Sequence, residues 1–228
     1  MILLAMDSSA KSASVAICDG ETLLGQYFQN NGLTHSRTLL AMTENLLRNL
    51  ELPISGIDLF AVSSGPGSFT GVRIGVSTVK GLAWGADKPA CGVSTLEAMA
   101  HQMPEHGIII CPVMDARRSQ VYNALFKWKG DSLYRLCEDR AVSLDDLAAE
   151  LKGCDSQICL IGDGASISHE HLTAAGVPCR LAPALLRCQT AYGVALAALR
   201  SEQIPAVDLE PSYLRPSQAE RERRASEA

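Results

Sequence analysis

Aromatic side chains are scarce in this sequence, which limits how its core can be built. Phe, Trp and Tyr make up only 5% of the 228 residues, although 47% of the residues are hydrophobic. Such a composition is typical of a soluble globular protein whose core consists mainly of aliphatic side chains. The length allows one large domain or two smaller ones of about 100 residues each.

An excess of basic residues is also missing. The formal net charge is −5, whereas a protein that binds nucleic acid by itself usually carries a basic surface. The densest basic cluster alternates with glutamates near the C-terminus, at Arg221, Arg223 and Arg224. We expect 216–228 to form a charged, disordered tail, with weak contact to nucleic acid as the alternative.

The sequence has no long hydrophobic run. The opening run, Met1 to Met6, stops at Asp7 after six residues, too soon for a signal peptide or a membrane span. It fits a buried first strand better. We therefore expect a cytoplasmic protein that has no contact with a membrane.

Motifs for metal binding and for common types of catalysis are absent. The eight cysteines include no CxxC pair, and we expect free thiols in a reducing compartment. The five histidines form no HExxH motif and no recognisable Ser-His-Asp set. The sequence therefore predicts neither a metal site nor catalytic residues.

The remaining pattern divides the chain into two similar halves. Three short strands, at 2–6, 13–18 and 21–29, are separated by gaps too short for crossover helices, so they form an antiparallel meander. A helix over about 35–50 follows, then a strand at 57–63, a helix over about 71–85, a strand at 89–93, and a helix that a capping box starts at Ser94 and Glu97.

The second half begins the same order again. Strands are expected at 107–114, 120–127, 133–136 and 157–161, with helices at 143–151 and about 190–202. Residues 165–189 show no clear pattern. Two such halves predict a two-lobed actin-like (ASKHA, ribonuclease H-like) α/β fold with a reduced second lobe. A single doubly wound sheet is the alternative.

We place the lobes at 1–104 and 105–215, and the last helix could pack back on the first lobe.

Each predicted half opens with a strand that ends in aspartate. Asp7 is followed by Ser8 and Ser9, and Asp115 occupies the equivalent place in the second half. In actin-like ATPases an aspartate in this place holds metal-bound water beside phosphate. The alternative for Asp7 is a capped turn, and for Asp115 an ion pair with Arg117 or Arg118.

A glycine-rich segment occupies residues 65–73, Gly-Pro-Gly-Ser-Phe-Thr-Gly-Val-Arg. It leads into a helix N-terminus, where anions often bind. However, it matches neither a Walker A loop, nor a full GxGxxG motif, nor a nucleophile elbow. The helix that it opens carries small residues at 71, 75, 77, 78, 81 and 85, which indicates close packing either within the molecule or against a partner.

Several of these segments, in this order, resemble the TsaB (YeaZ) family. The residues that carry the resemblance are 2–9, 34–36, 64–75, 92–96, 115–117 and 211–215. The glycine-rich segment is specific to this family and its catalytic relatives, whereas the others are individually weak.

The resemblance implies an accessory role in making N6-threonylcarbamoyladenosine next to the tRNA anticodon. The implied partners are a catalytic TsaD-type paralogue, a TsaE-type ATPase, and a second copy of the chain when it is alone, with tRNA contacted only through the complex. No cofactor is implied for the chain itself, although ATP or ADP and Mg²⁺ are possible in the complex. The implied partner surface is a helix pair that contains His35, Leu39, Gly71, Arg73, Gly75, Val76 and Val79, whereas Asp7, Ser8, Ser9 and Asp115 would be vestigial phosphate-side residues.

One departure from the catalytic relatives bears on activity. TsaD-type proteins bind their metal through an HxxxH pair on the helix after the fifth strand, and the matching positions here are Thr95 and Met99. Neither side chain is a plausible substitute for those ligands. We therefore expect a non-catalytic scaffold; an ATPase or a peptidase-like enzyme acting on a protein partner remains the alternative.

Overall fold

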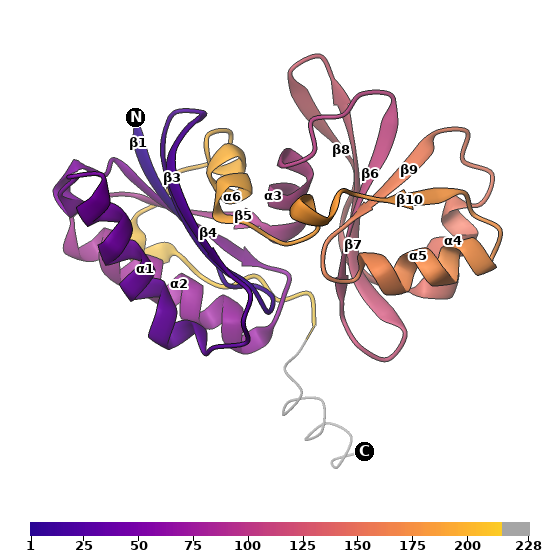
Figure 1. Ribbon diagram of the computed structural model, residues 1–228, viewed down its shortest axis with the longest axis horizontal. Coiled ribbons are helices and arrows are strands. Elements are labelled where there is room, and N and C mark those ends of the chain that lie inside the picture. Colours follow the sequence, from indigo (N-terminus) through magenta and orange to yellow (C-terminus); the bar gives the residue numbers. More distant parts are fainter. Residues whose placement is uncertain (216–228) are drawn as a thin grey trace, which may run out of the picture.

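The computed structural model describes residues 1–215 and contains two five-stranded mixed sheets, one in each lobe (Figure 1). The strand orders are β3-β2-β1-β4-β5 and β10-β9-β6-β7-β8. When the second order is read from its other edge, as β8-β7-β6-β9-β10, it matches the first, with β6 to β10 in the places of β1 to β5. The structure thus confirms the predicted α/β duplication and excludes a single sheet.

The first lobe combines a meander with parallel crossovers. Strand β1 pairs antiparallel with β2 and parallel with β4, and β4 pairs parallel with β5. Its elements are β1 (Ile2–Asp7), β2 (Ala13–Asp19), β3 (Thr22–Gln29), α1 (His35–Asn49), β4 (Leu59–Gly65), α2 (Phe69–Gly85), β5 (Ala90–Ser94) and α3 (Thr95–His101).

The second lobe repeats this arrangement with shorter helices. Strand β6 pairs antiparallel with β7 and parallel with β9. Its elements are β6 (Ile108–Asp115), β7 (Gln120–Lys129), β8 (Ser132–Ser143), α4 (Leu144–Leu151), β9 (Gln157–Ile161), α5 (Ala165–Ala174), β10 (Cys179–Leu181) and α6 (Ala191–Ala198).

The two lobes exchange their last helices. Leu96 and Met99 of α3 pack in a core cluster with residues of the second sheet, although α3 directly follows the first sheet in the chain. Val194 and Ala195 of α6 pack on the first sheet, beside Leu3 and other residues of β1 and β2. Figure 1 shows α3 and α6 between the two sheets. Each sheet therefore buries one face with a helix from the other half of the chain.

Most predicted elements are present, but some boundaries differ. Helix α2 begins two residues early because the Ser68 side chain accepts a hydrogen bond from the Gly71 amide and caps it. Ser94 caps α3 through the Glu97 amide, as predicted. Strand β8 is longer than the expected 133–136, because it pairs with β7 along its length. Helix α6 is shorter than the expected 190–202, and α5 and β10 lie where the sequence showed no clear pattern.

After α6 the chain returns along the first lobe as an extended strap, residues 202–215. Ile204 exchanges backbone hydrogen bonds with Ala90, and the Ser212 amide donates to the Ser64 carbonyl at 2.7 Å. The Lys80 ammonium donates to the Val207 carbonyl at 2.6 Å. The basic cluster at 221–224 lies outside the described residues. Within 1–215, no helix is long and apolar enough to cross a membrane.

Candidate functional site

The glycine-rich loop between β4 and α2 packs directly on the turn that follows β1. A Cβ at Gly71 would lie 2.1 Å from the Ser8 carbonyl oxygen, and one at Gly67 would lie 2.5 Å from that of Ser9. The Ser8 hydroxyl donates to the Gly71 carbonyl at 2.9 Å. The glycines therefore permit backbone contact inside the lobe, which was one of the two interpretations of this segment.

Gly65 makes the third close contact and requires a glycine for two reasons. Its φ is +136°, and a Cβ there would lie 2.1 Å from the Ser212 carbonyl oxygen. The strap thus passes directly over the end of β4. The sequence match at 211–215 gave no indication of this contact, because the two segments are about 145 residues apart in the chain.

A cleft of about 590 Å³ lies beside this loop and reaches both lobes. Its lining includes Phe69 and Tyr213, whose rings stack with centroids 4.8 Å apart. The Arg73 guanidinium lies 4.3 Å from the centre of the Phe69 ring, and its Nε donates to the Tyr213 hydroxyl at 2.9 Å. This cluster fastens the strap to the start of α2.

Asp7 lies under the cleft and is not part of its lining. The side chain is 1% exposed, and its Oδ1 accepts from the Ser9 amide and hydroxyl at 3.0 and 2.9 Å. Its Oδ2 accepts from the Ser63 hydroxyl. Burial raises the pKa of Asp7 despite these donors. The carboxyl group is thus tied into the interior, in agreement with the capped-turn interpretation.

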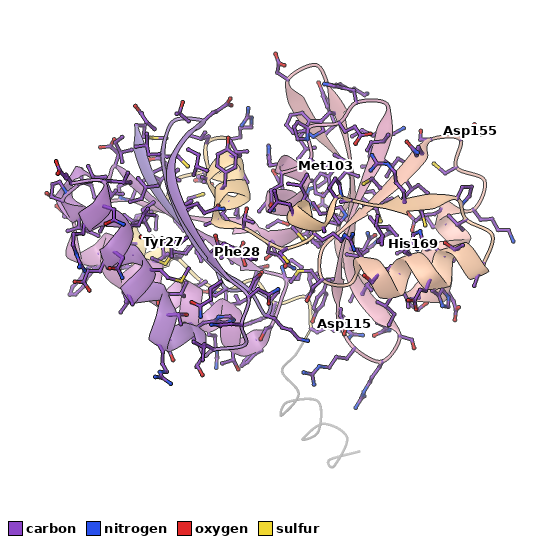
Figure 2. All side chains as sticks on the ribbon, in the orientation of Figure 1. Tyr27, Phe28, Met103, Asp115, Asp155 and His169 are labelled. Atoms are coloured by element: carbon purple, nitrogen blue, oxygen red, sulfur yellow. The ribbon has the colours of Figure 1, made fainter. Side chains whose placement is uncertain are left out.

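Asp115 does line the cleft and is exposed (Figure 2). Its Oδ1 accepts from the Arg117 amide at 2.7 Å, so the carboxylate caps its own turn. Within residues 1–215, the alternative ion pair with Arg117 or Arg118 is not formed. Of the four predicted phosphate-side residues, only Ser9 and Asp115 face the cleft. Asp7 and Ser8 are buried, so the two aspartates do not face one ligand together.

Three other residues of the cleft were not predicted from the sequence to be site residues. Asp163 also lines it; although the residue is exposed at the surface, desolvation by the surrounding protein atoms raises the pKa of its carboxyl group. Arg215 lines the cleft and donates to the Ala116 carbonyl at 3.3 Å, which joins the strap to the second lobe. Tyr213 is the third. Asp163 stands between Gly162 and Gly164, a pattern typical of a turn, but nothing in the sequence placed it in the same cleft as Ser9.

The residues predicted for a partner surface divide into buried and exposed sets. Leu39 and Val79 are 0% exposed and Val76 is 3% exposed, all in the core between the helix pair and the sheet. A Cβ at Gly75 would meet the Ser8 hydroxyl oxygen at 2.5 Å. Arg73 is exposed. These buried residues can support a partner surface, but they cannot touch a partner in this conformation.

The outer face of the helix pair is made by other residues. Trp84 is 72% exposed and Leu40 is 53% exposed. A Cβ at Gly81 or Gly85 would have no heavy atom within 4 Å. The small residues of α2 therefore serve two purposes: those at 71 and 75 face the interior, whereas those at 81 and 85 face outward.

His35 stands at the first position of α1 and fixes a turn of the same lobe. Its Nε2 lies 2.8 Å from the Ala10 carbonyl oxygen, whereas its Nδ1 is buried and has no hydrogen-bond partner in the part of the chain that the structure describes. Thr34 occupies the capping position, but its side chain makes no capping hydrogen bond. His35 therefore connects the start of α1 with the turn after β1.

Thr95 and Met99, the positions of interest for a metal, are both fully buried on α3. The Met99 sulfur packs against Gly162, where an added Cβ would lie only 3.1 Å from it. No group of three His, Cys, Asp or Glu side chains that could hold a metal ion occurs within the described part of the chain. At this place the side chains pack into the second lobe.

The comparisons with known proteins agree with one family. A family model described as TsaD, tRNA N6-adenosine threonylcarbamoyltransferase, matches residues 30–170. The chain is 34% identical over 167 residues, 73% of either chain, to the Bacillus subtilis tRNA threonylcarbamoyladenosine biosynthesis protein TsaB. The chain belongs to the TsaB family. The Haemophilus influenzae TsaB is 29% identical and covers 94% of both chains.

Solved structures place the TsaB fold among actin-like proteins. YeaZ from Pseudomonas aeruginosa superposes with a TM-score of 0.80 at 26% identity, covering 93% of this chain and 99% of that one. Another structure, described as an uncharacterized protein with similarity to peptidase YeaZ, gives the same TM-score at 27% identity, covering 94% and 99%. Component A of an Acidaminococcus fermentans dehydratase, at 12% identity and a TM-score of 0.51 over 88% and 97%, shares the fold.

Proposed function

We propose that this chain is a non-catalytic scaffold and activator of a TsaD-type transferase. The complex would form N6-threonylcarbamoyladenosine next to the anticodon, in cytoplasmic tRNAs that read codons beginning with adenine. The names of the relatives support a role in this modification. The net charge of −5 fits a protein that contacts tRNA only through its partners.

The packing of Thr95 and Met99 carries the non-catalytic part of the proposal. Both side chains are fully buried in α3, where a catalytic relative would present its two histidines. Placing ligands there would require repacking of the cluster that holds α3 against the second lobe. This argument favours a structural role over transfer chemistry.

Reconstitution with a TsaD-type protein, a TsaE-type ATPase and tRNA tests the function. We expect modified nucleoside, measured by mass spectrometry of digested tRNA, only when this chain and the TsaD-type protein are both present. Modification by this chain without the TsaD-type protein would contradict the proposal. Modification at the same rate without this chain would contradict it as well.

The outer face of α1 and α2 is the partner surface that we propose for the TsaD-type protein. Trp84 and Leu40 supply exposed apolar area there, and Gly81 leaves room for a close approach. Gly81→Arg should abolish copurification of the TsaD-type protein. Ala149→Arg, at an exposed position of α4, is the matched control and should leave copurification unchanged.

The same surface would form the homodimer of the isolated chain. Light scattering of the Gly81→Arg variant should then give a monomer mass, whereas the Ala149→Arg control should keep the mass of the parent protein. If Gly81→Arg removed one pairing and left the other intact, the two pairings would not share this surface.

A further inference from the structure

A second cavity, of about 620 Å³, lies between the lobes and shares no lining residue with the cleft at Asp115. Its walls come from β3, α3, β7, α6 and the segment before α6. Its volume is within the usual range for a small-molecule site. Neither the glycine-rich loop nor the helix pair contributes to it, so the proposed function leaves this cavity without a role.

Aromatic rings from separate elements surround this inter-lobe cavity in a chain that has few of them. Phe28 of β3, Trp128 of β7 and Tyr192 of α6 all line it. The imidazole of His101 meets the Trp128 indole edge to face, with centroids 5.6 Å apart. Burial lowers the pKa of His101 to about 4, so the ring is neutral at pH 7. Flat apolar walls of this kind suit a planar ring.

Two hydrogen-bond donors of the lining have no partner among residues 1–215. The Trp128 Nε1 and the Gln102 Nε2 are both buried and unpaired. The Gln102 Oε1 already accepts from the Thr190 hydroxyl at 2.9 Å, which fixes the orientation of the amide. Buried donors without partners are uncommon, because each represents a lost hydrogen bond. Both side chains line the cavity, so acceptor atoms on a ligand there would satisfy these donors once the side chains turned toward it.

The charge of the lining argues against an anion. Arg200 is already paired with Glu21 at 2.8 Å, and Asp131 adds a further negative charge. His101 is neutral, so it adds no cation at pH 7. A phosphorylated or carboxylated ligand would therefore meet an ion pair that is already neutral and the negative charge of Asp131.

From these features we infer that the inter-lobe cavity binds a neutral, planar heteroaromatic ligand of about the size of a purine or its nucleoside. Its ring lies among Phe28, His101 and Trp128, and its acceptor atoms take hydrogen bonds from Trp128 and Gln102.

Caffeine is the test probe, because it is neutral, planar and carries acceptors but no donors. In a ¹⁵N-labelled Trp84→Phe variant the single indole N–H resonance belongs to Trp128, since the chain has two tryptophans. We expect caffeine to move this resonance downfield with saturation, as a new hydrogen bond requires. Toluene, which has no acceptor, should cause no downfield shift. Theophylline-7-acetate, an anionic analogue of caffeine, should bind about tenfold more weakly.

Gln102→Leu, made in the same Trp84→Phe background, removes the second donor and should weaken caffeine binding about fivefold. Gln203→Leu, at an exposed position outside the cavity, is the matched control and should leave the affinity unchanged. Thermal melting of both variants establishes that they are folded. The comparison between caffeine and toluene needs no cavity substitution, so it decides the matter even if Gln102→Leu does not fold.

Two results would overturn the inference. One is a Trp128 resonance that caffeine does not shift. The other is an equal response to caffeine and toluene, because the cavity would then select apolar area and not acceptor atoms. Equal affinity for caffeine and theophylline-7-acetate would overturn the requirement for a neutral ligand.

Discussion

Gly71 and Gly81 lie on the same helix in opposite steric surroundings. A Cβ at Gly71 would lie 2.1 Å from the backbone oxygen of Ser8, whereas one at Gly81 would meet nothing within 4 Å. We expect Gly71→Ala to lower the free energy of unfolding by about 2 kcal/mol, because the contact outweighs the gain in helix propensity. Gly81→Ala should raise it by about 1 kcal/mol. Urea denaturation measures both.

The two variants act as mutual controls, because both make the same chemical change in α2. If both variants lost a similar amount of stability, the close contact between α2 and the turn after β1 would not explain the need for glycine at residue 71.

His101 makes stability depend on pH. Burial lowers its pKa from 6.5 to about 4. The unfolded chain therefore takes up this proton near pH 6.5 and the folded chain only near pH 4, so stability falls as the pH is lowered through that window. The loss approaches about 3 kcal/mol at its lower end. Denaturation of the parent and of His101→Phe at several pH values measures it.

The difference between these two proteins isolates His101 from the carboxyl groups that titrate in the same range. Stability of the parent relative to His101→Phe should decline between pH 6.5 and pH 4. A constant difference across that range would show that folding does not lower the pKa of His101.

At the scale of elements, the strap depends on a few contacts with α2. Tyr213 stacks on Phe69 and accepts a hydrogen bond from Arg73. Tyr213→Ala should weaken this attachment by about 1 kcal/mol and increase amide exchange at Ser212, whose N–H binds the Ser64 carbonyl. Hydrogen exchange with mass spectrometry measures the effect.

Tyr134→Ala is the control for this change, because Tyr134 is similarly exposed but lies on β8 of the second lobe. It should leave exchange in the strap unchanged. Unaltered exchange at 209–215 in Tyr213→Ala would show that backbone contacts alone hold the strap.

At the scale of the whole molecule, the exchanged helices make the lobes interdependent. Helices α3 and α6 touch at Gly193, where a Cβ would lie 2.3 Å from the Ala98 carbonyl oxygen. Gly193→Ala should therefore destabilise both lobes together, by about 2 kcal/mol. The two tryptophans provide the measurement, since Trp84 lies in the first lobe and Trp128 in the second.

Unfolding followed by fluorescence in Trp128→Phe and Trp84→Phe backgrounds should give one common midpoint shift on adding Gly193→Ala. A shift reported by only one tryptophan would mean that the lobes unfold independently, and that the helix exchange does not couple them.

The order of elements could be read from the sequence because it depends on local properties. Hydrophobic periodicity, the cap at Ser94, and the short gaps in each meander predict the strands and helices of both halves. The motifs also identified the family. Boundaries failed where pairing partners set them, as in β8, whose length is set by β7.

Only the tertiary structure decided where the functional candidates lie. The sequence could not separate Asp7, which is buried, from Asp115, which faces the cleft, because both end an equivalent strand. It could not separate Gly71 from Gly81, since what a glycine accommodates is a neighbour distant in the chain. The exchanged helices, the strap and the cavity between the lobes all arise from contacts between segments far apart in sequence, which no local pattern records.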